Sequence, residues 1–107
     1  MYLIWALQSS GVAYFEGLSE EARRIQKDNS ERRFRAALTS QPGLRATYLL
    51  ERPNGDVVAF SIWESEDAMR TGIANANSVP LLPDQRGEDI PSPTRTEMLQ
   101  VRDAWPE

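Results

Sequence analysis

A stretch in the middle of the chain, residues 41–69, constrains the fold more than any other part of the sequence. It reads QPGLRATYLLERPNGDVVAFSIWESEDAM. Pro42-Gly43 marks a turn, and segments 44–51 and 57–63 are rich in residues that favour strands. Asn54-Gly55 lies between them and is a strong hairpin signal, since a type I′ turn needs φ > 0 at both central residues. The stretch therefore predicts a β-hairpin that leads into a helix.

The expected turn also predicts which residues of the hairpin share a face. With Asn54 and Gly55 as the two loop residues, one face holds three cross-strand pairs: Leu50 with Ala59, Tyr48 with Ser61, and Ala46 with Trp63. The opposite face then pairs Leu49 with Phe60 and Thr47 with Ile62. Both faces are apolar, so each of them requires a covering layer.

The N-terminal part of the chain predicts a strand followed by a helix. Residues 2–8 form a short apolar run typical of a buried strand, and Ser9-Ser10-Gly11 is expected to end it. Residues 12–18 fit either the start of a helix or an apolar loop. Ser19 is a good helix N-cap because Glu20 and Glu21 follow it at the positive end of the helix dipole. The helical pattern then runs to about Thr39.

This first helix changes its apolar face part-way along. Its early apolar residues and its late ones lie on faces roughly 150° apart at 100° per residue, the two sets being Leu18, Ala22 and Ile25, and Phe34, Ala37 and Leu38. Two interpretations stay open. Either the helix is broken or kinked near Asp28 to Ser30, or it is one long helix whose N-terminal half is largely solvated.

The C-terminal half predicts a second helix, a long loop and a last strand. Ser65 can cap a helix that ends near residues 75–77. Segment 79–93 holds four of the seven prolines, so it is expected to be a loop, either a mobile linker or a lid. Residues 94–102 alternate like a strand. The 107 residues form a single domain, since this length suits one modest core.

Composition excludes several classes of protein and site. The net charge is −4 with no basic patch, so nucleic acid is not an expected partner. The absence of cysteine excludes disulfides and zinc-thiolate sites, and the absence of histidine removes the commonest transition-metal and haem ligand. We therefore expect no metal and no cofactor. The apolar N-terminus is too short to span a bilayer, which favours a cytoplasmic protein away from membranes.

The element order β, α, β, β, α, β is that of a ferredoxin-like α+β fold. It predicts a four-stranded antiparallel sheet with both helices on one face. The other face of the apolar hairpin then needs a different cover, and a partner's sheet is the simplest one. We therefore expect a homodimer in which the two sheets face each other.

Four segments resemble the antibiotic biosynthesis monooxygenase family of the dimeric α/β-barrel superfamily. They are Pro42-Gly43, Tyr48-Leu49-Leu50, Gly55-Asp56-Val57-Val58 and Ser61-Ile62-Trp63-Glu64-Ser65-Glu66-Asp67-Ala68. The resemblance covers residues 44–69 well and the outer strands by pattern only. The superfamily also includes haem-degrading enzymes, whose usual iron ligand this chain lacks. Gln26, Lys27, Asn29 and Ser30 stand where such families usually show apolar residues, so the packing of the first helix is expected to differ.

The resemblance implies a cofactor-independent monooxygenase-like protein that acts on a small aromatic or polyketide-like compound. Such chemistry needs an apolar pocket, a few hydrogen-bond donors and exclusion of water. The candidate substrate-binding residues are Trp63, Tyr48, Ser61 and Asn75, although Trp63 and Tyr48 equally fit a structural role in the core. The alternative function is a non-catalytic small-molecule-binding or structural member of the same fold. The absence of histidine and cysteine favours this alternative.

Overall fold

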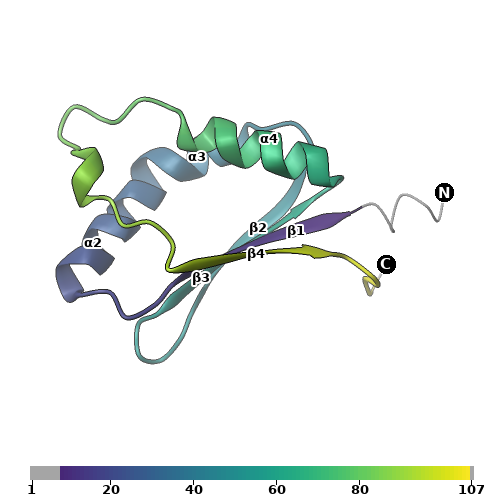
Figure 1. Cartoon of the computed structure of the whole chain (residues 1–107), viewed down its shortest axis with the longest axis horizontal. Coiled ribbons are helices and arrows are strands. Elements are labelled where there is room, and N and C mark those ends of the chain that lie inside the picture. The colour runs from purple at the N-terminus through teal and green to yellow at the C-terminus, as the bar shows by residue number, and fades with distance from the viewer. Residues whose placement is uncertain (1–7, 107) are drawn as a thin grey trace.

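The computed structural model describes residues 8–106 and has one antiparallel sheet with helices on one face (Figure 1). The strand order is β2-β3-β1-β4. The elements are β1 (Ser9–Phe15), α2 (Glu20–Asn29), the π-helix η1 (Ser30–Phe34), α3 (Arg35–Thr39), β2 (Leu44–Glu51), β3 (Val57–Trp63), α4 (Glu66–Asn77), the short 3-10 helix η2 (Gly87–Asp89) and β4 (Arg95–Gln100). The expected ferredoxin-like α+β fold is confirmed.

The first strand lies further along the chain than the sequence predicted. It spans Ser9–Phe15 and pairs with β3 on one side and β4 on the other. Ser9-Ser10-Gly11, expected to end a strand, instead begins it, and most of the predicted strand (2–7) lies outside the described residues. Contacts with α4 explain why these small residues form a strand. A Cβ on Gly11 would lie 3.2 Å from Ile73 Cδ1 and 3.4 Å from Met69 Sδ, so small residues suit a central strand directly beneath α4.

The first helix is continuous through its change of face, because a π-helical turn joins its two halves. Ser19 caps it as predicted, and its Oγ accepts a hydrogen bond from the Ala22 N–H at 3.1 Å. From Ser30 to Phe34 the helix is of the π type and then continues as α3. A π turn inserts about one extra residue and so rotates the apolar stripe between the two halves. The continuous helix, with no buried residue in its N-terminal half, agrees with the second open interpretation, which did not include the π turn.

The central hairpin has the predicted strands but a different register. Tyr48 pairs with Phe60, and Thr47 pairs with Ser61. The predicted pairing, Tyr48 with Ser61 and Leu50 with Ala59, is therefore wrong by one residue. The turn explains the shift: the Gly55 N–H donates to the Arg52 carbonyl at 2.9 Å, and only Gly55 in this loop has a positive φ. Pro53-Asn54-Gly55 thus forms a three-residue loop, a type I turn that ends in a glycine bulge, instead of a type I′ turn.

The core lies where α3 and α4 cover the sheet near the C-terminal end of β3. Its buried apolar residues are Leu38, Trp63, Met69 and Ala76, with Phe34, Leu44 and Ile73 packed around them. Ser65 caps α4 as predicted, its Oγ accepting a hydrogen bond from the Ala68 N–H at 3.1 Å. The core is therefore concentrated under α3 and α4, at one end of the helical layer.

Ion pairs close the opposite end of the sheet, where α2 begins. Glu16 accepts hydrogen bonds from Arg52 at 2.7 Å and from Arg95 at 3.1 Å, and both arginines lower the pKa of Glu16. Asp56 is buried and accepts a hydrogen bond from the Gly17 N–H at 3.0 Å. This bond is the main reason that the pKa of Asp56 is lowered. The network connects the hairpin turn to β1 and β4.

Candidate functional site

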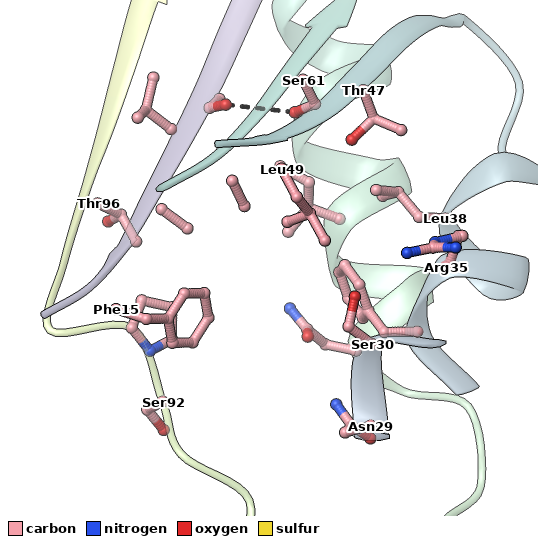
Figure 2. Close-up of a pocket in the computed structure, with 18 of the residues that line it drawn as sticks. Phe15, Asn29, Ser30, Arg35, Leu38, Thr47, Leu49, Ser61, Ser92 and Thr96 are labelled. Atoms are coloured by element: carbon pink, nitrogen blue, oxygen red, sulfur yellow. Dashed lines mark hydrogen bonds between the residues drawn. The ribbon is translucent and has the colours of Figure 1, made fainter. Parts of the chain in front are cut away.

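A cavity of about 860 Å³ lies between the sheet and the first helix. Figure 2 shows its two walls, with Phe15, Leu49 and Thr47 on strands and Ser30, Arg35 and Leu38 on helical segments. The lining is mainly apolar, and it includes Ala13, Ala59 and Ile73. A cavity of this size is within the usual range for small-molecule sites.

The cavity exists because α2 does not pack on the sheet. No residue of α2 is buried. Its cavity-facing side carries Gln26 and Asn29, polar residues that cannot form a dry contact with Phe15 and Leu49. These polar residues led to the expectation that the first helix would pack differently. The structure confirms that expectation as an open space between helix and sheet.

Several hydroxyl groups on the cavity wall have no hydrogen-bond partner within residues 8–106. Ser30, the first residue of the π-helix, is only 7% exposed, and no hydrogen bond of its hydroxyl is present in this part of the chain. Thr47 and Thr96 line the sheet side (Figure 2), and their hydroxyls are likewise unpaired within the described chain. These groups can donate hydrogen bonds to oxygen atoms of a bound molecule.

The proline-rich segment 79–93 covers one side of the cavity. Leu81, Ile90 and Pro91 from this segment contribute to the lining. Arg33 holds the start of the segment, since its guanidinium donates to the carbonyl oxygens of Val79 at 2.5 Å and Pro80 at 3.2 Å. The segment therefore covers this side of the cavity, and we refer to residues 79–93 as the lid.

A second arginine of the first helix fastens the same lid further along. Arg32 forms two hydrogen bonds with the Asp84 carboxylate, at 2.9 and 3.0 Å, and this pairing lowers the pKa of Asp84. Gln85 also donates to the Asn29 side-chain oxygen at 3.2 Å. The sequence did not reveal these contacts, because the partners are 52 and 56 positions apart in the chain.

Two of the predicted site residues, Trp63 and Ser61, do lie together. Trp63 is fully buried, and its indole N–H donates to Ser61 Oγ at 2.8 Å. Ser61 in turn donates to the Gly11 carbonyl at 3.3 Å. Ser61 is on the cavity wall, whereas Trp63 is not among the lining residues. Trp63 therefore supports the wall from inside the core.

Of the other two predicted residues, Asn75 does not line the cavity, and Tyr48 borders it with an exposed side chain. The one-residue register shift places the Tyr48 side chain on the outer face of the sheet, where Tyr48 is 54% exposed and its ring centroid is 6.2 Å from that of Phe60. The predicted convergence of Tyr48 with Trp63 and Ser61 is thus wrong. Asn75 is exposed on α4, and its amide donates to the Gln41 side-chain oxygen at 3.3 Å.

Within residues 8–106, no group of three or more acidic side chains is placed to hold a metal ion. Tyr14 has a raised pKa, chiefly because its hydroxyl donates to Glu97 at 2.5 Å. The Arg95 guanidinium lies over the Tyr14 ring, 3.6 Å from its centroid. Tyr14 and Arg95 do not line the cavity, and Glu97, which does, accepts the Tyr14 hydrogen bond.

Comparison with solved structures identifies the fold. The cofactor-independent oxygenase SnoaB from Streptomyces nogalater is similar to this chain, with a TM-score of 0.68 and 22% identity. The match covers 95% of this chain and all of the SnoaB chain. A monooxygenase from the gene ActVA-Orf6 of Streptomyces coelicolor, solved with nanaomycin D, matches 95% of this chain and 94% of its own, with a TM-score of 0.66 and 17% identity.

This chain shares the fold of these two solved structures. The same fold is found in the haem-degrading protein Rv3592 from Mycobacterium tuberculosis, which matches 94% of this chain over its whole length, with a TM-score of 0.60 and 14% identity. No protein-family model and no curated protein sequence matches the chain. Among the described residues, no helix is long and apolar enough to cross a membrane.

Proposed function

We propose that this protein is a monooxygenase-like enzyme that oxidises a small aromatic or polyketide-like compound in the cavity between the first helix and the sheet, without a metal or organic cofactor. The observation that carries the proposal is the cavity itself. Its walls are mainly apolar, the hydroxyl groups of Ser30, Thr47 and Thr96 are unpaired within the described chain, and a lid covers one side. A ring system of two or three fused rings would fit about 860 Å³. The cytoplasmic location expected from the sequence belongs to the same proposal.

The proposed reaction uses electrons from the substrate. An activated methylene group beside aromatic rings loses a proton to give a stabilised anion, which then reacts with dioxygen. One oxygen atom becomes a carbonyl group on that carbon, and the other leaves as water with the two hydrogens. The protein's part is to bind the rings, keep water out and donate hydrogen bonds from Ser30 and Thr47 to the oxygen substituents.

A second candidate function is binding without catalysis. It is favoured by the lack of histidine and cysteine in the chain, and the acidic lining residue, Glu97, is engaged by Tyr14 on the outer face. In that case the protein would carry or sequester the same class of compound. The two functions share the cavity and differ only in turnover.

We further propose that the protein acts as a homodimer whose outer sheet faces pack together. Large apolar residues remain exposed on this face in the single chain, among them Tyr48, Leu50 and Leu99. An exposed apolar sheet face of this kind usually marks an interface. A second copy would cover it and leave both cavities on the helical sides.

Oxygen consumption tests the enzyme proposal directly. Hydroxylated naphthalenes and anthrones are supplied to the protein, and dissolved oxygen and product mass are followed together. Turnover should give one carbonyl oxygen per dioxygen consumed and should be lost in Ala59→Phe, which places a ring in the cavity beside Ala13 and Leu49. Thr71→Phe, on the exposed side of α4, is the matched control. Tight binding of these compounds with no oxygen uptake would favour the binding protein instead.

A further inference from the structure

The cavity has an uneven set of charged groups. Its lining includes three arginines, Arg33, Arg35 and Arg70, and one carboxylate, Glu97. The whole chain has a net charge of −4, so this local excess of positive charge runs against the overall composition. Charge gathered on one wall of an apolar cavity selects the sign of the ligand that enters it.

Three of these four groups already have partners. Arg33 donates to the Val79 and Pro80 carbonyls, and Arg70 pairs with Glu66 at 2.8 Å. Glu97 accepts the hydrogen bond of Tyr14 on the other side of the sheet. Arg35 is different, because no hydrogen bond or ion pair of its guanidinium is present within residues 8–106. The free cation of this cavity in the described chain is therefore Arg35.

The surroundings of Arg35 suit a group with a negative charge attached to an apolar body. Figure 2 shows the side chain on the helical wall beside Leu38, across the cavity from Phe15. Ser30, one helical turn earlier and unpaired in the described chain, lines the same wall. Arg35 also borders an adjoining groove, and none of the acidic residues there forms an ion pair with it. The other charged residues of this groove are Glu20, Glu31, Glu51, Arg23, Arg24 and Lys27. Arginine and a hydroxyl together can bind the two oxygens of a carboxylate.

We propose that the cavity selects an organic anion, an aromatic or other apolar ring system that bears one acidic group, and that Arg35 binds this acidic group. The proposal rests on the proposed function, since it specifies which compounds the same cavity accepts. Phe15 and Leu49 contact the ring system, and Ser30 donates a hydrogen bond to the acidic group. Arg35 acts here as a specificity-determining residue.

Two fluorescent probes that share one ring system test the proposal. 1-Anilinonaphthalene-8-sulfonate carries an acidic group that N-phenyl-1-naphthylamine lacks. In Arg35→Gln, the ratio of the sulfonate affinity to the amine affinity is expected to fall about three- to tenfold, the range for loss of one partly solvated charge-assisted contact. The amine affinity itself is expected to stay unchanged. Arg35→Lys keeps the positive charge, so its affinity ratio is expected to lie between those of Arg35→Gln and the wild type.

Arg45→Gln is the matched control. Arg45 is also an arginine with no ion pair or hydrogen bond within residues 8–106, and it does not line the cavity. Its replacement is expected to leave the affinity ratio unchanged. Unfolding midpoints of all variants confirm that they are folded. The wild-type protein gives an independent readout, since added salt should weaken binding of the sulfonate and not of the amine.

The outcomes separate this proposal from the proposed function. An unchanged ratio in Arg35→Gln, or an equal loss for both probes, would overturn the role of Arg35 while the cavity remains a binding site. Binding of neither probe by the wild-type protein would overturn both proposals. A preference for cationic ring compounds over both probes would also overturn the role of Arg35, because the cavity would then not select anions.

Discussion

A Cβ atom on Gly72 would lie less than 3.0 Å from both Cη2 and Cζ3 of Trp63. The indole is fully buried against α4 at this point. Glycine in the middle of a helix ordinarily costs about 1 kcal/mol relative to alanine. The helix accepts this cost because only glycine lets the backbone approach the ring so closely.

Gly72→Ala is therefore expected to destabilise the protein by about 1–3 kcal/mol, the usual cost of overpacking a core, even though alanine is the better helix former. Trp63→Phe removes the two ring atoms that the new methyl group would meet. The double variant should lose less stability than the sum of the single variants. Urea unfolding of the four proteins measures this coupling, and strictly additive losses would contradict it.

The hairpin turn provides a second prediction. Gly55 has φ +93°, and a side chain there would also meet the Arg23 guanidinium. Gly55→Val should lower the unfolding midpoint clearly, since a β-branched residue resists positive φ. Gly55→Asn should cost less, because asparagine tolerates that region better. Equal midpoints for the valine variant and the wild type would show that the turn is of another type in solution.

Acid should destabilise the ion-pair network at the α2 end of the sheet. The folded-state pKa values of Glu16 and Asp56 are lowered from their ordinary values of 4.5 and 3.8. Their contribution to stability is thus complete above those values and is lost as the pH falls through and below them. Unfolding midpoints followed from neutral pH to below pH 3.8 should fall less steeply in Asp56→Asn than in the wild type. Identical slopes would mean that Asp56 titrates normally.

The outer sheet face is expected to form the dimer. The wild-type protein should sediment at twice its 12.1 kDa chain mass at micromolar concentration. Leu99→Glu puts a charge on this face and should shift the equilibrium to the monomer, whereas Thr71→Glu on the exposed side of α4 should not. A wild-type protein that sediments only as the 12.1 kDa species would end this proposal.

Helix caps and turn residues correctly predicted the helices and strands that they border. Ser19 and Ser65 cap their helices as expected, and the strands 44–51 and 57–63 have the predicted bounds. The predicted hairpin register was wrong because Pro53 favours a type I turn, which adds one residue to the loop. A single residue was enough to move Tyr48 from the cavity side to the outer face.

Tertiary contacts account for the features that the sequence did not reveal. Ser9-Ser10-Gly11 has poor strand propensity, yet it forms a strand because hydrogen bonds on both sides and the close approach of α4 outweigh that propensity. Arg32 and Arg33 contact residues 44 to 52 positions away in the chain, so a local helical pattern could only place them on a solvated face. The polar residues of α2 were the signal that did point to the cavity.

The central claim is that small apolar molecules bind between the first helix and the sheet. Amide chemical-shift mapping with N-phenyl-1-naphthylamine tests it most directly. Binding in the cavity should shift the amide resonances of Ser30, Leu38, Thr47, Leu49 and Leu81, which line it. Shifts confined to outer-face residues that do not line the cavity, such as Leu50 and Leu99, or no shifts at all, would contradict the account.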